Sequence, residues 1–268
     1  MKKTSIFFLM LLSVTIVAAQ QVLRIPYGNK TIYGIISRPA PSSGTSKNKV
    51  AIISHGFNGS HHFGRDYFQT LNKLGYQVYT FDFPCGSVRS NTDSNTMNMS
   101  VLDEKECLKA IVRYFRKQKD TDKNNIVLIG ESQGGLVSAL AAAELKKQIS
   151  ALVLIYPAFC IPDNWNGRYP TAEAIPDTTY IWNVPLGRRF FLEIHDMNPF
   201  DIIDAYKGPV LIVHGDRDPI VPAVYSEKAK DAYRKARLEI IPGAGHGFNP
   251  QQRVISNSLV ERFLQDIH

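Results

Sequence analysis

Short apolar segments alternate with helical patterns along most of the chain. Apolar runs bounded by turn residues predict β-strands, and apolar residues spaced three or four apart predict amphipathic helices. The predicted strands cover residues 22–25, 31–37, 50–53, 78–83, 126–129, 151–156, 210–213 and 238–241. The predicted helices cover residues 67–74, 101–117, 136–145, 225–236 and 254–267. Strands that alternate with helices predict the α/β fold class, with a mostly parallel eight-stranded sheet flanked by helices on both faces.

The stretch 160–205 interrupts this alternation. It contains no clear strand but is rich in aromatic residues, namely Trp165, Tyr169, Tyr180, Trp182, Phe190, Phe191 and Phe200. An insertion of this length between two core strands predicts a short lid over a binding site. The alternative is a structural cap whose aromatic side chains only pack on the body of the domain, and the composition does not separate the two.

The amino-terminal segment 1–19 has the features of a signal peptide. Lys2 and Lys3 precede an apolar stretch that ends in small residues at Val17-Ala18-Ala19. The apolar run is shorter than the roughly 20 residues that span a bilayer, which favours a cleaved signal over a stable membrane anchor. We therefore expect a single mature domain at 20–268, exported by a bacterium to the periplasm or the extracellular space.

The distribution of charge argues against nucleic acid as a partner. The formal net charge is +7, and removal of Lys2 and Lys3 lowers it to +5. The remaining basic residues are scattered among acidic ones and form no basic stripe. We find no metal-ligand spacing and no phosphate-binding glycine-rich loop, so the sequence predicts neither a metal site nor a cofactor.

The most informative motif is Gly-Glu-Ser-Gln-Gly at 130–134. It lies between the apolar strand at 126–129 and a helix of small residues at 136–145. In this setting G-x-S-x-G is the nucleophile elbow, in which a sharp turn holds the serine hydroxyl above the sheet. The motif alone is weak evidence, because short patterns of this kind also arise by chance. Its strand-turn-helix setting makes Ser132 the candidate nucleophile.

A serine nucleophile needs a histidine base, and the base needs a carboxylate that orients it. The strand at 210–213 is followed by a loop that carries Asp216 and Asp218, and the strand at 238–241 is followed by a glycine-rich loop that carries His246. The order along the chain is serine, aspartate, histidine. Position in the loop leaves both Asp216 and Asp218 open as the orienting acid.

The tetrahedral intermediate of acyl transfer also needs two N–H donors aimed at its oxyanion. One donor comes from the residue after the nucleophile and the other from a loop after an earlier strand. Gln133 fits the first position. His55-Gly56-Phe57 follows the strand at 50–53, so the Phe57 backbone N–H is the expected second donor.

With these residues placed, the chain resembles the α/β-hydrolase superfamily and, within it, the bacterial feruloyl and cinnamoyl esterases. The resemblance rests on His55-Gly56-Phe57, Asp82-Phe83, the elbow at 130–135, His214-Gly215 with Asp218, and Gly245-His246. It implies the α/β-hydrolase fold, and its H-G-x-x-D-x-x-V-P pattern favours Asp218 over Asp216.

The same resemblance implies an aromatic acyl pocket beneath the lid. In these esterases an acid and a tyrosine of the lid contact the phenolic hydroxyl groups. Asp163 falls near the place of the acid, Phe191 stands where the tyrosine is expected, and Trp182 is a further lid aromatic. We therefore take Asp163, Trp182 and Phe191 as candidate substrate-binding residues, with the missing tyrosine hydroxyl as a departure from the family.

The strand order of the family also bears on the three cysteines, Cys85, Cys107 and Cys160. It implies that Cys85 and Cys160 follow strands separated by two others, about 14 Å apart at ~4.8 Å per strand. A disulfide requires Cα atoms within about 7 Å. We therefore expect free thiols.

Together these features predict an exported serine carboxylesterase that works through an acyl-enzyme. The expected partner is a small-molecule or polysaccharide-linked ester, with feruloyl, cinnamoyl and other aryl esters as candidates. One alternative is a serine peptidase of the prolyl-oligopeptidase type, which shares the elbow and the triad but usually carries a large amino-terminal domain that the pattern of this chain does not show. A second alternative is a catalytically inactive binding module, which the intact set of candidate residues disfavours.

Overall fold

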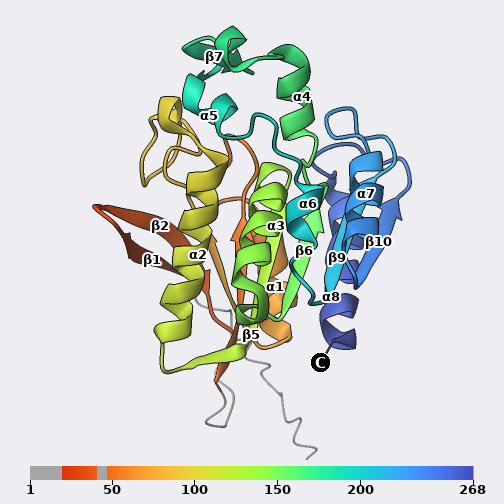
Figure 1. Cartoon of the computed structure of the whole chain (residues 1–268). Coiled ribbons are helices and arrows are strands. Elements are labelled where there is room, and N and C mark those ends of the chain that lie inside the picture. The colour runs from red at the N-terminus through yellow and green to blue at the C-terminus, as the bar shows by residue number, and fades with distance from the viewer. Residues whose placement is uncertain (1–19, 41–46, 268) are drawn as a thin grey trace, which may run out of the picture.

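An eight-stranded sheet runs through the centre of the protein (Figure 1). The computed structural model describes residues 20–40 and 47–267, and the signal peptide predicted at 1–19 lies outside these residues. In spatial order the strands are β1 (Gln20–Tyr27), β2 (Lys30–Ser37), β4 (Tyr76–Phe81), β3 (Asn48–Ser54), β5 (Thr121–Glu131), β6 (Ala151–Ile155), β9 (Val210–Gly215) and β10 (Ala236–Ile241). β2 pairs antiparallel with β1 and β4, and all other neighbours in the sheet are parallel. The prediction of a mostly parallel eight-stranded sheet is confirmed.

Helices cover both faces of the sheet. They are α1 (Phe68–Lys73), α2 (Val101–Lys117), α3 (Gln133–Leu145), α7 (Val224–Ala232) and α8 (Pro250–Asp266). Successive residues of a strand point to opposite faces, so Val50 and Ile52 of β3 join the core with α2 and α3, while Ala51 and Ile53 join the core with α1 and α8. Because both faces are buried, the central strands are continuous apolar runs without polar alternation.

Two helix starts follow from capping side chains. Ser100 accepts a hydrogen bond of 3.0 Å from the Asp103 backbone N–H, and α2 begins at Val101 as the apolar spacing predicts. Asn249 and Gln252 form a capping box, and α8 therefore begins at Pro250. The apolar pattern alone placed this start four residues later.

The insertion 160–205, the predicted lid, has its own secondary structure. It contains α4 (Ile161–Arg168), a 3₁₀ turn (Ala172–Ala174), β7 (Thr178–Ile181), β8 (Val184–Gly187), α5 (Arg188–Leu192) and α6 (Phe200–Ile203). The expectation that it contains no strand is wrong, because β7 and β8 pair as an antiparallel hairpin. Trp182 and Asn183 form its two-residue turn with φ angles of 47° and 64°, as tight hairpin turns require. In Figure 1, α4, α5 and β7 lie above the carboxyl ends of the central strands.

Within the part of the chain that the structure describes, none of the helices is long and apolar enough to cross a bilayer.

Candidate active site

Ser132 lies in the sharp turn between β5 and α3. Its backbone has φ 53° and ψ −121°, a conformation that costs free energy and persists only when the surroundings enforce it. The surroundings leave no room for side chains at the flanking glycines. A Cβ on Gly130 would lie 2.2 Å from the Gly134 carbonyl oxygen, and a Cβ on Gly134 would lie 2.4 Å from the His55 carbonyl oxygen. The motif is therefore a nucleophile elbow in its geometry as well as in its sequence.

The structure brings the three predicted triad residues into one hydrogen-bonded chain. Nε2 of His246 lies 2.9 Å from Oγ of Ser132, and Nδ1 of the same ring lies 2.8 Å from Oδ2 of Asp218. The three residues come from the loops after β5, β9 and β10, and the carboxyl ends of these parallel strands meet at one edge of the sheet. This is the arrangement in which an imidazole takes a proton from a serine hydroxyl.

Hydrogen bonds keep Asp218 ionised although its side chain is fully buried. Burial by itself raises the pKa of Asp218, but hydrogen bonds from His214, His246 and the backbone N–H groups of Val221 and Ile220 outweigh it and hold the pKa well below its usual range. The buried carboxylate therefore carries its negative charge next to the imidazole, where it stabilises an imidazolium.

Asp216, the other candidate for the orienting acid, hydrogen-bonds a neighbouring loop. Its Oδ1 accepts a hydrogen bond of 2.6 Å from the Gly243 backbone N–H, so Asp216 joins the loop after β9 to the loop after β10. His214 lies beneath these loops and contacts Ser226 Oγ at 2.6 Å and the Val221 carbonyl at 2.9 Å. Both residues thus support the loops that present Asp218 and His246.

The loop after β3 lies against the elbow, where a second oxyanion donor is expected. A Cβ on Gly56 would lie 3.0 Å from Cβ of Ser132, and Phe57 and Gln133 border the same cavity as Ser132. His55 shapes this loop. Its Nε2 accepts a hydrogen bond of 3.1 Å from the Phe83 N–H, so Nδ1 carries the proton and donates to the Gly56 carbonyl at 2.7 Å. Burial lowers the pKa of His55 to about 4, which keeps this ring neutral.

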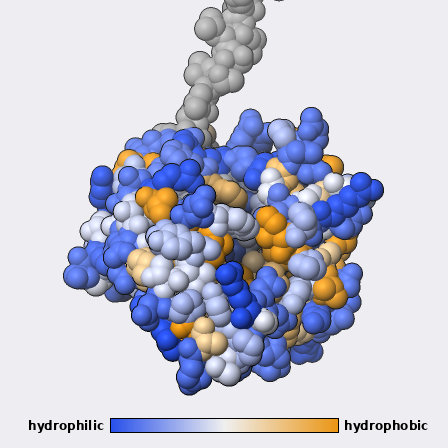
Figure 2. Space-filling view, turned by 90° about the horizontal axis from the view of Figure 1, so that it is seen from above, coloured by the Kyte–Doolittle hydropathy of each residue, from blue (hydrophilic) through white to orange (hydrophobic). Residues whose placement is uncertain are grey.

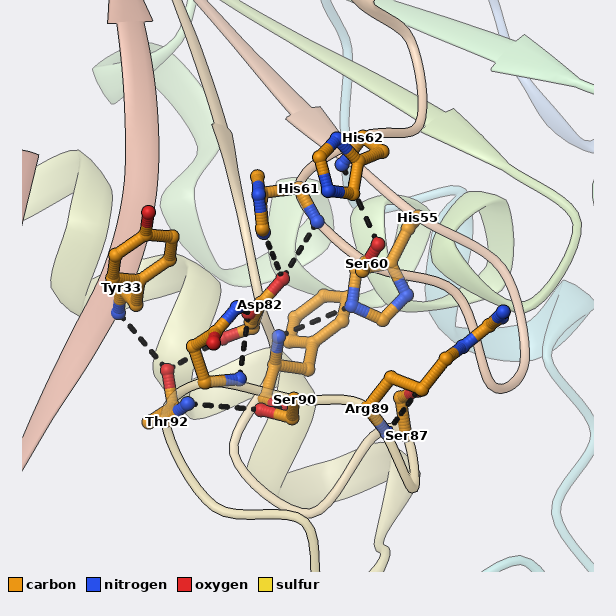
Figure 3. A network of polar contacts seen from close by, with 12 residues as sticks. Tyr33, His55, Ser60, His61, His62, Asp82, Ser87, Arg89, Ser90 and Thr92 are labelled. Atoms are coloured by element: carbon orange, nitrogen blue, oxygen red, sulfur yellow. Dashed lines mark hydrogen bonds and ion pairs between the residues drawn. The ribbon is translucent and has the colours of Figure 1, made fainter. Parts of the chain in front are cut away.

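Asp82 anchors the far end of the same loop (Figure 3). One carboxylate oxygen accepts hydrogen bonds from the His61 backbone N–H at 2.6 Å and from His61 Nδ1 at 2.8 Å, and the other accepts from Asn91. Burial raises the pKa of Asp82, but these hydrogen bonds prevail and lower it. The segment that follows β4 adds a contact, since the Gly86 carbonyl accepts the Asn58 N–H at 3.1 Å. The segment 83–87 therefore lies against the oxyanion loop, which is the loop after β3 that carries Phe57.

A cavity of about 390 Å³ opens beside Ser132 beneath the lid. In the view from above, a hollow near the centre of this face is bordered by hydrophobic residues (Figure 2). The lid contributes Trp165, Ile181, Trp182 and Phe190, and the body contributes Phe57 and the segment 219–221. Among the side chains described, those that line the cavity carry no formal charge. An uncharged and largely apolar group fits this space.

The three predicted substrate-binding residues lie in different places. Trp182 lines the cavity, and its ring packs edge-on against Phe57 with centroids 5.7 Å apart. Asp163 is exposed, accepts a hydrogen bond of 2.8 Å from the Tyr225 hydroxyl and does not line the cavity. Phe191 is 1% exposed and packs among Trp165, Tyr169 and Phe190. The structure therefore brings only Trp182 of these three to the cavity.

Two of the lining residues that sequence reasoning missed are neighbours of residues it chose. Asn164 follows Asp163 on α4 and faces the cavity, and Phe190 precedes Phe191 on α5 and does the same. Neighbouring residues on a helix point in directions about 100° apart, so an error of one position changes the face. The lining residues could be told from their neighbours only by knowing which face each of these two short helices turns toward the cavity.

The three cysteines are free, as predicted, and all three are buried. Cys160 borders the cavity, and burial raises its pKa to about 11. It is therefore a thiol that contributes to the apolar wall. Within residues 20–40 and 47–267, no group of three or more histidine, cysteine and acidic side chains is arranged to hold a metal ion.

Comparison with known proteins shows the family and the fold of the chain. The sequence profile of the dienelactone hydrolase family matches residues 34–262. The chain is similar to the structure of Est1E from Butyrivibrio proteoclasticus with bound ferulic acid, with a TM-score of 0.82 and 26% identity, over 91% of this chain and 98% of that one. The prediction of an α/β-hydrolase fold is confirmed.

Curated relatives include a serine hydrolase and an esterase. The chain is 26% identical over 159 residues to the Homo sapiens serine hydrolase BPHL, covering 52% of this chain and 55% of the relative. It is 29% identical over 149 residues to the Mycobacterium tuberculosis esterase LipC, covering 48% of this chain and 36% of the relative. It spans 36% to 66% of the length of these and similar curated relatives. The prediction of membership in a superfamily of serine hydrolases is confirmed, and the chain belongs to the dienelactone hydrolase family.

Proposed function

We propose that this protein is a serine carboxylesterase in which Ser132 is the nucleophile, His246 the general base and Asp218 the acid that orients the imidazole. The observation that carries the proposal is the unbroken hydrogen-bond chain from Ser132 through His246 to Asp218 beside an uncharged cavity. A serine hydroxyl is a weak nucleophile by itself, and this arrangement is the usual way to activate it.

In the first half of the reaction, Ser132 Oγ attacks the ester carbonyl carbon while His246 Nε2 takes its proton. The carbonyl electrons move to the oxygen, which accepts hydrogen bonds from the backbone N–H groups of Phe57 and Gln133. The C–O bond to the alcohol then breaks, and His246 returns the proton to the departing oxygen. Water repeats the sequence on the acyl-enzyme and releases the carboxylic acid and the free serine.

We infer that the acyl group is neutral and largely apolar, such as a hydroxycinnamate or another aryl acid. The cavity offers aromatic and aliphatic contacts from the lid, and a charged acyl group would lose its hydration there without gaining a counter-ion. The ferulic acid bound to Est1E, a protein 26% identical in sequence, supports an aryl acyl group. The Asn164 amide is a polar group within this wall that can hydrogen-bond a phenolic hydroxyl.

We also propose export of the protein, on the basis of the two lysines and the apolar run within residues 1–19. An exported esterase of this kind meets esters linked to polysaccharides. Expression in a bacterial host followed by amino-terminal sequencing of the periplasmic and culture fractions tests this, with deletion of residues 2–19 as the matched control. Recovery of the intact chain in the cytoplasm alone contradicts export.

A substrate panel tests the catalytic proposal. Nitrophenyl esters, methyl ferulate, acetylated xylan and aminoacyl amides are offered to the wild type and to Ser132→Ala. We expect turnover of the esters by the wild type and a loss of at least about a thousandfold in the variant. Equal activity of the two proteins contradicts the role of Ser132. Turnover of the amides alone favours the peptidase alternative instead.

A further inference from the structure

A buried acid that the mechanism above does not use lies directly behind the oxyanion site. Glu104 belongs to the first turn of α2, its residue is 1% exposed, and its side chain faces the start of α3. Its Oε2 lies 2.9 Å from Nε2 of Gln133. Gln133 is the first residue of α3, and its backbone N–H is one of the two proposed oxyanion donors. The Glu104 carboxyl therefore holds the side chain of a residue whose backbone is placed to meet the substrate.

The second carboxyl oxygen of Glu104 faces the other half of the oxyanion site. Oε1 has no hydrogen-bond partner among the described residues. A Cβ on Gly86 would lie 3.0 Å from this oxygen and 3.4 Å from Cε1 of His55. The Gly86 carbonyl accepts the Asn58 N–H at the end of the oxyanion loop, and His55 begins that loop. Glu104 thus lies between the two segments that supply the oxyanion donors.

The titratable groups around Glu104 favour its neutral form. Asp103 precedes it on α2, Cys107 lies one turn further along, and the neutral ring of His55 faces it from the loop after β3. Arg189 of the lid binds Asp103 and forms no ion pair with Glu104. Burial, and to a smaller extent Asp103, raise the pKa of Glu104 to about 8, against the opposing effect of the Gln133 hydrogen bond. At neutral pH the group is an uncharged carboxylic acid.

We propose that Glu104 is a positioning residue for the oxyanion hole, which in its neutral form fixes Gln133 and on ionisation lowers the turnover rate. This inference rests on the proposed function. An ionised Glu104 would be a buried charge without a counter-ion, and such a charge draws in water or displaces its neighbours. It would also place negative charge behind the atoms that stabilise the oxyanion, where negative charge opposes catalysis. Both effects act on kcat rather than on substrate binding.

The test compares pH profiles of kcat and KM for a neutral methyl ester between pH 6 and pH 9.5, with spontaneous hydrolysis subtracted. We expect wild-type kcat to fall about tenfold between pH 7 and pH 9.5, with KM constant within about twofold. Glu104→Gln keeps the size and the hydrogen bond, so its kcat should lie within about threefold of the wild type at pH 7 and stay constant to pH 9.5. The control Glu106→Gln changes a partly exposed carboxylate of the same helix and should behave as the wild type.

A third variant separates positioning from simple filling of space. Glu104→Leu retains most of the volume but removes the contact with Gln133, and we expect about a tenfold loss of kcat at pH 7 with little change in KM. Wild-type kcat in Glu104→Leu overturns the proposal. An alkaline decline of equal size in Glu104→Gln overturns it too, as does the absence of any decline in the wild type.

Two measurements distinguish the role of Glu104 from the stability of the fold and from the role of Ser132. Loss of the near-ultraviolet circular dichroism signal together with the loss of activity at pH 9.5 overturns the proposal, because the acid would then govern the fold as a whole. If Ser132→Ala retains activity, the proposed function itself fails. If the activity depends on Ser132 but Glu104→Gln leaves its pH profile unchanged, only the role of Glu104 fails.

Discussion

Arg189 of the lid binds Asp103 of α2 through two hydrogen bonds, of 2.6 Å and 2.9 Å. A second link lies beside it, where the hydroxyl of Ser100 donates to Glu193 of the lid. Ser100 is also the cap of α2, and Glu104 in the first turn of this helix contacts Gln133. The start of α2 therefore connects the lid to the oxyanion site.

The first prediction concerns this connection. Both side chains of the Arg189–Asp103 pair are about half exposed, so Arg189→Ala should lower the free energy of unfolding by less than about 1 kcal/mol. The lid loses an anchor, however, and KM for aryl esters should rise about threefold, with faster proteolysis between residues 170 and 190. Arg237→Ala removes an equally exposed pair far from the lid and serves as the control. Equal KM values for the two variants contradict the prediction.

The second prediction separates the two aspartates of the loop after β9. Asp218→Asn removes the charge beside His246 and favours the wrong tautomer, so kcat should fall about 10³- to 10⁴-fold. Asp216→Asn keeps an oxygen that can accept the Gly243 N–H, and its kcat should stay within about threefold of the wild type. Steady-state kinetics on one nitrophenyl ester measure both, and a large loss in Asp216→Asn alone would reverse the assignment.

Much of the fold could be predicted from the sequence because strand and helix periodicities are local signals. The apolar run at 126–129 predicts the buried part of β5, but β5 extends from Thr121 to Glu131, because Thr121 pairs with Asn48 of β3 beyond a break in the register. The hairpin of β7 and β8 was missed for another reason. Each strand has four residues and one contains Pro185, so neither shows a strand period long enough to detect.

The candidate site, too, could be predicted only in part from the sequence. Ser132, Asp218 and His246 could be found because each lies in the turn or loop that follows a strand, and strand ends are predictable from sequence. The lid residues that line the cavity could not be found in this way. Asp163 and Asn164 are neighbours on one helix turn, and only the direction of the side chain decides which of them faces the cavity. The role of Glu104 depends on the packing of α2 against α3, which the sequence of neither helix specifies.

The third prediction tests which side of α4 faces the substrate. We expect Asn164→Leu to lower the ratio of kcat/KM for methyl ferulate over methyl cinnamate about tenfold, because the phenolic hydroxyl loses its partner in an apolar wall. Asp163→Asn should leave this ratio within about twofold, since Asp163 contacts Tyr225 outside the cavity. A ratio that responds to Asp163→Asn but not to Asn164→Leu would favour the assignment made from the family resemblance.

A second buried acid, Glu131, lies at the elbow but does not line the substrate cavity. It precedes the nucleophile, accepts a hydrogen bond from the Tyr156 hydroxyl, and has one oxygen without a partner among the described residues. Arg253 lies 3.8 Å away. Burial, only partly offset by Arg253 and the Tyr156 hydroxyl, raises the pKa of Glu131 to about 7. The ring of Tyr156 also packs against His246, with centroids 4.8 Å apart.

The fourth prediction follows from this raised pKa. Between the ordinary pKa of 4.5 and about 7 the folded protein binds a proton that the unfolded chain has lost, so stability falls as pH rises through this window. The full shift corresponds to about 3 kcal/mol. Glu131→Gln cannot ionise, so its free energy of unfolding relative to the wild type should rise by up to about 3 kcal/mol between pH 5 and pH 8 in urea titrations. Glu227→Gln, at an exposed position, is the control and should show no such change. If the difference in unfolding free energy between Glu131→Gln and the wild type does not vary with pH, Glu131 is already ionised at pH 5 and the prediction is wrong.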